Sequence, residues 1–531
     1  MKELNLSELS IKQKVGLTMC GHINNQWDEK KTEDNILYAL DMIKNHSLGA
    51  IWVCRNFDGW EDAIKRVKEV ADYPILIMTD AEQGFGENII GKHNAIGMTG
   101  REDLAYTFGK VTAAAARKVG YNVVCSPLLD LVDSDAYCNM TIRSYGSDKI
   151  EVTRLAAAEA RGMHDAGVLT VGKHYPGGRA DAIMDTHMGE GLSYEAEEEL
   201  IDYFLYPYIE LDKMGLLDGM MTGHVRFPNI DPENPASLSS KMIGIIRDKG
   251  FDGISITDDL CMQGIVAKYG KTESRGLAVQ NGNDLALPWL ANEVSFNAMW
   301  ECYEKGVLTE ERVNEAAARV LRAQHKLTLI ENPQDATDAD MELFEKLNTD
   351  CVWARADEGL DHTVSKDGRH LFVVLTPNGT QIDDMGNLGL DTFTDMWYRP
   401  DEICKQIKET FPNSGIYALD EFPTSRQNWR LLSINDQYDD LVFITFVSGA
   451  SYQGDENLTG RVLSEIRALQ ITNRISALVH FGNPFVLEKI DSHIPRVIIG
   501  GQSAKAINSG IKVLAGDYPA KGKLTYDIKL K

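Results

Sequence analysis

The chain lacks several features that would each indicate a particular class of protein. Its eight cysteines are scattered through 531 residues without CxxC pairs or metal-ligand spacing, so we expect neither a disulfide framework nor a metal site. Basic residues number 54 against 79 acidic ones, and the formal charge of -25 disfavours binding to nucleic acid or to an anionic membrane. No apolar run approaches the length that spans a bilayer.

Two further absences concern targeting and cofactors. The first twenty residues alternate charged and apolar side chains and contain no continuous apolar core, which is not typical of a secretory signal. We therefore expect reduced cysteines and a cytoplasmic location. In residues 370–531 no GxGxxG follows a strand pattern and no GxxxxGK[ST] occurs, so nucleotide binding there has no support. Nothing in the sequence demands a cofactor, and none is expected.

The first 330 residues instead alternate short apolar strands with longer helical patterns. Eight such strands and the helices between them favour a parallel sheet closed into a (β/α)8 TIM-like barrel. The strand candidates are VGLTMCGH, GAIWVCR, PILIMTD, YNVVCSP, VLTVGKH, GMMTGHV, ISITDD and NDLALPW.

The remaining sequence predicts a linker and a second domain. LTEERVNEAAARVLRAQHKL reads as a helix with a threonine cap, and the polar segment 331–369 reads as a linker. From residue 370 to residue 531 the strand–helix alternation restarts, which predicts an α/β sandwich domain, an open parallel sheet covered on both faces. Its strand candidates are LFVVLTP, GIYALDE, LVFITFV, ISALVHFG and RVIIGG.

Polar residues end five of the barrel strands, where a (β/α)8 enzyme places its chemistry. They are Asp80, Asp130, Lys173 with His174, His224, and Asp258 with Asp259. Each has a structural alternative: a strand-ending aspartate is often a helix N-cap, a lysine can extend along the surface, and a histidine can be satisfied in the core. Repetition over five strands favours a polar pocket that binds hydroxyl groups.

A second motif, Asp185-Thr186-His187, lies in a Gly-rich polar loop after the fifth strand. An aspartate beside an imidazole fixes its tautomer and raises its basicity, as a general acid/base requires near neutral pH. The alternatives are a solvated loop with an incidental DxH and a metal site. Two candidate ligands on one loop make a weak metal site, however.

Taken together, these segments resemble glycoside hydrolase family 3, in its β-N-acetylhexosaminidase branch. KHYPGG is similar to that family's KHFPGHG block, MDTH to its DSH block, and GFDGISITDDLCMQGI to its GFxGxxxSDxLxM block. Further similarities occur in LSIKQKVGLTM, TDAEQG, IRSYG, MTGHV, NPASLSS and YPAKGKLTYDI.

The resemblance implies a retaining double displacement. Asp258 matches the nucleophile that forms a glycosyl-enzyme intermediate, and His187, oriented by Asp185, matches the acid/base. Asp259 is disfavoured as nucleophile because consecutive strand residues point to opposite sides. Four positions match residues that hold the hydroxyls of the nonreducing-end sugar: Asp80, Arg143, Lys173 and His174.

The DTH motif also indicates a branch of the family. In the β-glucosidase branch the acid/base is a glutamate from the second domain, so here the resemblance implies an exo-acting β-N-acetylhexosaminidase. It would release terminal N-acetylglucosamine in muropeptide or chitin-oligosaccharide turnover. Some members of this branch transfer the sugar to phosphate, and a neutral histidine repels that dianion less than a carboxylate does.

Other readings remain open: a phosphate-dependent β-N-acetylglucosaminide phosphorylase, a β-glycosidase of other sugar specificity, and a non-catalytic carbohydrate-binding protein. The expected partner is a carbohydrate in each case, and the oligomeric state is open.

The sequence departs from the family pattern at three places. Phe85 occupies the position at which the related DQEGGRV motif has arginine, so a polar contact to the sugar is either absent or supplied elsewhere. KHYPGGRAD replaces the GHGD run and is one residue longer before the dyad, which alters the loop that carries His187. VSGASYQG in the second domain has no assignment.

Overall fold

The computed structural model describes residues 2–24, 28–133, 140–179, 185–290, 292–355, 361–377, 380–382, 388–390, 399–447, 451, 458–490, 493–501 and 503–529. Its contacts divide the chain into two compact units. The first contains Met1–Asn88, Ala105–Leu131 and Lys149–Met341, and the second contains Ile89–Leu104, Val132–Asp148 and Glu342–Lys531. The second unit therefore includes two segments from the N-terminal part of the chain.

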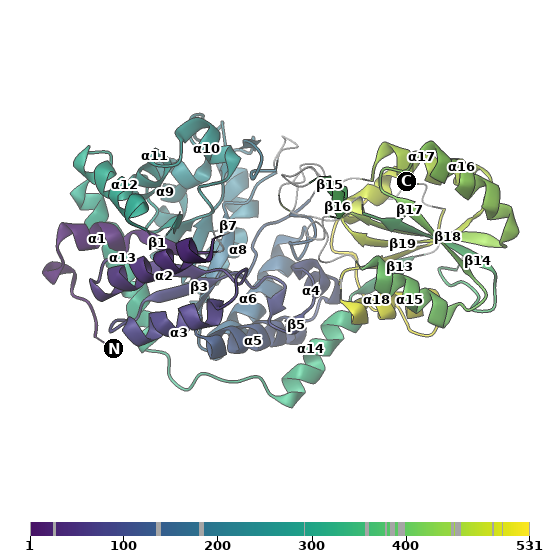
Figure 1. The fold of residues 1–531 in the computed structure, drawn as a ribbon, viewed down its shortest axis with the longest axis horizontal. Coiled ribbons are helices and arrows are strands. Elements are labelled where there is room, and N and C mark those ends of the chain that lie inside the picture. Colours follow the sequence, from purple (N-terminus) through teal and green to yellow (C-terminus); the bar gives the residue numbers. More distant parts are fainter. Residues whose placement is uncertain are drawn as a thin grey trace. The chain divides into compact units, whose positions relative to one another are not determined.

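The first unit is a nearly closed barrel of eight parallel strands, as predicted (Figure 1). Around the barrel the strands follow the order β11-β9-β7-β6-β3-β2-β1-β12, and a bridge between Ile256 and Leu285 links the two ends. The strands are β1 (Met19–Ile23), β2 (Ala50–Val53), β3 (Leu76–Thr79), β6 (Val123–Val124), β7 (Leu169–Tyr175), β9 (Gly219–Thr222), β11 (Ile254–Thr257) and β12 (Ala286–Leu290).

The strands read as apolar runs because both of their faces are buried. One set of side chains fills the barrel interior, among them Met78, Val123 and Ile256. The other set packs against the surrounding helices, among them Ile51 and Val124. Polar side chains at the carboxyl ends of the strands are therefore easy to identify in the sequence, because the strands themselves are apolar.

Helices connect and surround these strands. The predicted helix after the last strand is α13, and its N-cap Thr309 accepts a hydrogen bond from the backbone N–H of Arg312, as predicted. The helices are α1 (Ile11–Leu17), α2 (Glu29–Lys44), α3 (Trp60–Val70), α5 (Glu102–Val119), α6 (Lys149–Asp165), α8 (Tyr206–Lys213), α9 (Ser240–Asp248), α10 (Gln263–Tyr269), α11 (Glu273–Gln280), α12 (Glu293–Glu304) and α13 (Glu310–Thr328). No helix among the described residues is both long and apolar enough to cross a membrane.

The second unit contains a six-stranded sheet in the order β13-β20-β19-β18-β14-β17. Five strands match the predicted ones and pair in parallel: β14 (His370–Thr376), β17 (Gly415–Asp420), β18 (Asp440–Val447), β19 (Ile475–Gly482) and β20 (Arg496–Ile499). The sixth, β13 (Val352–Arg355), is an antiparallel edge strand on β20, so the sheet is mixed.

The segment 331–369, predicted as a linker, contains β13 and all of helix α14 (Asp338–Asp350). A four-residue strand that pairs with a segment almost 150 residues away leaves no local signal, which is why the sequence pattern missed it. Figure 1 shows α15 (Pro400–Thr410) and α18 (Ala504–Leu514) on one face of the sheet, with α16 (Ser425–Ile434) and α17 (Gly460–Ile471) on the other. The sheet is thus covered on both faces, as predicted.

The two N-terminal segments of the second unit join its core. Ala95 and Met98, from helix α4 (His93–Thr99), belong to the same apolar cluster as the sheet strands. Near the C-terminus, the hydroxyl of Tyr526 donates to the backbone oxygen of Ser144 at 3.0 Å and also bonds the backbone oxygen of Thr141. The chain end therefore holds residues 140–147 in place.

Candidate active site

Lys173 is the buried cation of the predicted site. It lies near the carboxyl end of β7, its side chain is 2% exposed, and its ammonium group bonds the Asp80 carboxylate and lies 2.6 Å from Oε1 of Glu82. Lys173 is therefore not a surface lysine. Glu82 is also buried, whereas Asp80 is half exposed and can face a ligand. The ammonium and carboxylate groups can donate to and accept from the hydroxyl groups of a ligand.

His174 is oriented by a second aspartate from a neighbouring strand end. Its Nδ1–H donates to Oδ2 of Asp130 at 2.9 Å, and its backbone N–H donates to the same oxygen at 2.8 Å. Asp130 follows β6, and its side chain is fully buried. These two bonds fix the plane of the imidazole ring.

Asp185 and His187, predicted as an acid/base dyad, are hydrogen-bonded to each other. Oδ1 of the buried Asp185 accepts from Nδ1 of His187 at 2.7 Å and from the His187 backbone N–H at 3.0 Å. The backbone oxygens of His187 and Thr186 in turn accept from the N–H groups of Gln263 and Gly264, each at 3.1 Å. The dyad loop is therefore attached to the start of α10, just beyond Asp258. Residues 180–184 of the altered loop lie outside the described residues.

Gly264 permits this attachment. A Cβ atom at position 264 would lie 2.6 Å from the backbone oxygen of Gly189 and 2.9 Å from that of Thr186. Both distances are shorter than real side chains allow, so a larger residue would push the dyad loop away from α10.

Asp258 and Asp259 follow β11 and differ in their surroundings. Burial raises the pKa of Asp258, but electrostatic interactions with His174, His224 and His187, together with the bond from the Asp259 backbone N–H, lower it to about 2. Burial raises the pKa of Asp259, and its bond from the Cys261 N–H only partly offsets that effect. Asp258 is therefore ionised throughout the physiological pH range, as a carboxylate nucleophile must be.

Electrostatic contacts connect six of the seven predicted site residues. Asp258 interacts with His174 and His187, and the buried Cys125 thiol interacts with Asp80, Lys173 and Asp258. Asp185 belongs to the group through His187. Arg143, the seventh, lies in the second unit, where its Nη1 is 3.4 Å from the sulfur of Met140. Its role at the sugar stays a prediction.

Three further polar residues lie at strand ends: His224 was predicted only as part of the polar pocket, and His22 and Cys54 were not predicted. His224, after β9, is buried between the Ser237 hydroxyl at 2.8 Å and the backbone oxygen of Asp259 at 2.9 Å. Its pKa is lowered, mainly by burial. Nε2 of His22, at the end of β1, lies 2.9 Å from the Cys54 sulfur, which follows β2. The position of His22 and Cys54 at strand ends is a signal that could have identified them.

Glu82 was also missed, although it follows Asp80 by two residues in the same TDAEQG motif. Phe85, which replaces the arginine of the related motif, lies in the short strand β4 (Gly84–Phe85). Its side chain is buried, with 4% of its surface exposed. This ring packs edge-on against Tyr121, with ring centroids 5.7 Å apart.

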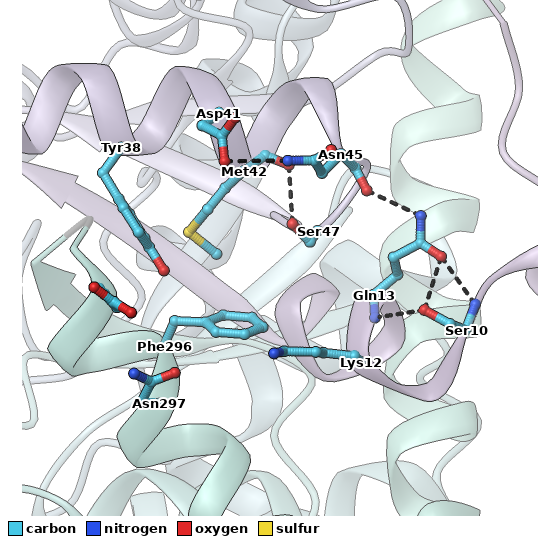
Figure 2. Close-up of a pocket in the computed structure, with 11 residues that line it drawn as sticks. Ser10, Lys12, Gln13, Tyr38, Asp41, Met42, Asn45, Ser47, Phe296 and Asn297 are labelled. Atoms are coloured by element: carbon cyan, nitrogen blue, oxygen red, sulfur yellow. Dashed lines mark hydrogen bonds between the residues drawn. The ribbon is translucent and has the colours of Figure 1, made fainter.

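A separate cavity of about 340 Å³ lies on the outer wall of the barrel (Figure 2). Its described lining comes mainly from α1, α2 and α12 and contains none of the predicted site residues. Its polar groups bond each other: the Gln13 amide donates to the backbone oxygen of Asn45 at 2.9 Å, and the Asn45 amide donates to Asp41 at 3.1 Å. These bonds brace neighbouring helices, so we assign the cavity no catalytic role.

Comparison with known proteins gives a family match over more than half of the chain. Residues 9–323 match the model described as the glycosyl hydrolase family 3 N terminal domain. A beta-hexosaminidase of Idiomarina loihiensis is 31% identical over 277 residues, which cover 49% of this chain and 80% of that protein. The beta-hexosaminidase LpqI of Mycobacterium tuberculosis is 31% identical over 308 residues, covering 53% and 77% of the two chains.

Solved structures extend the likeness to the whole chain. A glycoside hydrolase family 3 beta-N-acetylglucosaminidase from Paenibacillus sp. aligns with a TM-score of 0.79 at 23% identity, covering 98% of this chain and 100% of the other. The beta-glucoside phosphorylase BglX bound to 2FGlc aligns with the same TM-score at 22% identity, covering 98% and 95%. At these identities the structural likeness establishes the fold and not the substrate.

Proposed function

The chain belongs to glycoside hydrolase family 3, and we propose that it is a retaining exo-β-N-acetylhexosaminidase that releases terminal N-acetylglucosamine from β-linked glycosides. The observation that carries the proposal is the placement of an ionised Asp258 in the field of His187, whose ring is held by the buried Asp185. The relatives named beta-hexosaminidases support the sugar class.

The proposed reaction has two displacements. Asp258 attacks the anomeric carbon while His187 protonates the leaving oxygen, which gives a covalent glycosyl-enzyme intermediate. His187 then takes a proton from water, which attacks the same carbon and restores the starting configuration. Asp185 keeps the imidazole oriented through both steps. Asp80, Lys173 and His174 hold the sugar, and Arg143 matches a further sugar-binding position of the family.

The first test is turnover of 4-nitrophenyl β-N-acetylglucosaminide beside the β-glucoside, β-xyloside and β-N-acetylgalactosaminide. We expect turnover of the N-acetylglucosaminide at least tenfold above the β-glucoside. Preference for one of the other glycosides would refute the sugar assignment. Running each assay with and without phosphate separates hydrolysis from phosphorolysis: a sugar 1-phosphate product would assign the acceptor as phosphate.

Substitution of the nucleophile tests the mechanism. Asp258→Asn should lower kcat by at least about 10⁴-fold, because no carboxylate remains to form the intermediate. Asp259→Asn is the matched control: it changes the adjacent residue, whose carboxylate bonds the Cys261 N–H, and should retain most activity. Azide should restore turnover to Asp258→Ala and give an α-glycosyl azide. Similar losses in both asparagine variants, without azide rescue, would contradict the assignment.

A further inference from the structure

The Phe85 ring, which takes the place of an arginine in the related motif, lies beneath a guanidinium group from another strand. Arg55 follows Cys54 just after the end of β2, the strand next to β3, which precedes Asp80. The Arg55 Cζ lies 4.6 Å from the centroid of the Phe85 ring. At this distance the face of the ring attracts the cation, and the stacked geometry restricts the rotamers of a long side chain.

The guanidinium of Arg55 also makes a hydrogen bond. Nη2 of Arg55 donates to the backbone oxygen of Asp80 at 3.3 Å. The carboxylate of Asp80 is half exposed and bonds the buried Lys173. Arg55 is therefore attached to the backbone of Asp80, the residue whose half-exposed carboxylate bonds Lys173.

The Arg55 guanidinium keeps donors beyond the one that bonds Asp80. Its side chain is exposed, and within the part of the chain that the structure describes its guanidinium has no acceptor other than the oxygen of Asp80. A guanidinium carries five N–H donors in a planar arrangement. Stacking on Phe85 and one backbone bond leave several of these donors available to a ligand beside Asp80.

We propose that Arg55 binds a hydroxyl group of the nonreducing-end sugar beside Asp80, and so supplies the guanidinium that Phe85 cannot. This inference rests on the proposed function and assigns a further specificity residue to the same site. A sugar hydroxyl there would accept from Arg55 and donate to the Asp80 carboxylate. Such a pair of opposite polarity defines the position of one hydroxyl group.

Phe85 and Arg55 have different roles in the proposed contact. Phe85 is buried and supports the guanidinium from below, whereas Arg55 provides the contact. Phe85→Leu should therefore weaken the effect of Arg55 without abolishing it, because the bond to the Asp80 backbone oxygen remains. Arg55→Lys should also retain part of the contact, since an ammonium group still donates hydrogen bonds but does not stack as a planar group.

The test compares Arg55→Gln with wild type on 4-nitrophenyl β-N-acetylglucosaminide and on its 3-, 4- and 6-deoxy analogues. We expect kcat/KM for the parent substrate to fall about ten- to a hundredfold, as for a hydrogen bond from a charged group. With one of the deoxy analogues the two proteins should differ by less than about twofold, because the partner hydroxyl is gone. A general loss of stability in Arg55→Gln would lower activity on all four substrates alike, so it could not produce a dependence on one hydroxyl group.

Arg322→Gln is the matched control, since Arg322 is another exposed arginine of the first unit and pairs with the exposed Asp252. It should leave all four substrates unaffected. An Arg55→Gln effect that is below twofold, or is equal on all four substrates, would overturn the role of Arg55.

Failure of the proposed function gives a different result. If wild type turns over another glycoside of the panel instead, that function is wrong, and the Arg55 comparison is repeated with deoxy analogues of the preferred glycoside. If wild type turns over none, binding of N-acetylglucosamine is measured by calorimetry. At least tenfold weaker binding to Arg55→Gln than to Arg322→Gln would support the inference, and equal binding would overturn it.

Discussion

Asp258 and Asp259 carry the same carboxyl group, yet their neighbours move the two pKa values in opposite directions. Burial raises both. Three imidazoles outweigh burial at Asp258, whereas at Asp259 the adjacent Asp258 charge adds to the effect of burial. Asp258 therefore stays ionised, as the proposed nucleophile must be, whereas the Asp259 carboxylate accepts from the Cys261 N–H. A difference of this kind between neighbouring carboxyl groups is how an active site separates their roles.

His187 carries the residue-scale prediction for proton transfer. His187→Ala should lower kcat/KM about 10²- to 10⁴-fold for glycosides with poor leaving groups, which need a proton in the first step. It should change kcat/KM for a 2,4-dinitrophenyl glycoside by less than about tenfold, because that leaving group departs without protonation. The measurement is a series of aryl glycosides whose leaving groups span several pKa units.

The control for this series is Met188→Ala, which alters the exposed neighbour of His187 and keeps the imidazole. Its effect should not vary with the leaving group. Equal losses for good and poor leaving groups in His187→Ala would exclude the histidine as the acid.

At the scale of elements, one aspartate connects three parts of the barrel. Asp218 lies just before β9 and accepts from His164 of α6 at 2.8 Å, from Lys326 of α13 at 2.9 Å, and from the backbone N–H of Thr170 in β7 at 3.1 Å. Burial raises the pKa of Asp218, but His164 and Lys326 outweigh it and lower the pKa to about 2.

The lowered pKa predicts a pH-dependent loss of stability in Asp218→Asn. The folded-state pKa lies below the unfolded one, so the carboxylate stabilises the fold above about pH 4, and this contribution disappears as the pH falls toward 2. We expect Asp218→Asn to lower the free energy of unfolding by about 2 kcal/mol at pH 7 and by progressively less below pH 4. Urea unfolding at several pH values measures it.

The matched control is Asp252→Asn, which removes an exposed carboxylate that pairs with Arg319 and Arg322. An exposed pair of this kind contributes little, so the loss should stay below about 1 kcal/mol at every pH. A loss in Asp218→Asn that persists unchanged at pH 3 would contradict the ionic origin of its contribution.

The barrel strands could be predicted because both faces of each strand are buried, which leaves a continuous apolar run that ends in a polar residue. Asp80 and Lys173 could be predicted because they end apolar strand runs, and Asp185 and His187 because they match a known motif. Arg55 on Phe85 was not, because 30 residues and a helix separate two positions that meet only when β2 and β3 pair. β13 was missed because its partner lies far away in the sequence.

At the scale of the molecule, the two units do not follow chain order. The sequence pattern places residues 89–104 and 132–148 in the barrel half of the chain, but their contacts place them in the second unit. Ala95 and Met98 are buried in the apolar core of that unit. Cutting the chain near residue 341 would therefore remove the core of the second unit while leaving two of its segments behind. For this reason the experiments proposed above use the full chain.

This arrangement connects the C-terminus with Arg143. The Tyr526 hydroxyl bonds the backbone oxygens of Thr141 and Ser144, on either side of Arg143, and the Ser147 N–H donates to the backbone oxygen of Thr525 at 3.1 Å. If Arg143 binds the sugar, as the family resemblance implies, then the chain end determines where that arginine lies. Tyr526 would then be a positioning residue that acts through Arg143 and does not touch the sugar.

Tyr526→Phe tests this connection, because the ring stays packed near Phe485 while both hydroxyl bonds are lost. We expect KM to rise about three- to tenfold with kcat little changed, and no further rise when Tyr526→Phe is added to Arg143→Ala. The control is Tyr518→Phe, which removes a hydroxyl of the same unit that bonds Asp350 at 3.1 Å, and it should leave KM unchanged. Equal effects of the two tyrosine variants, or additive effects of Tyr526→Phe and Arg143→Ala, would show that the C-terminus does not act through Arg143.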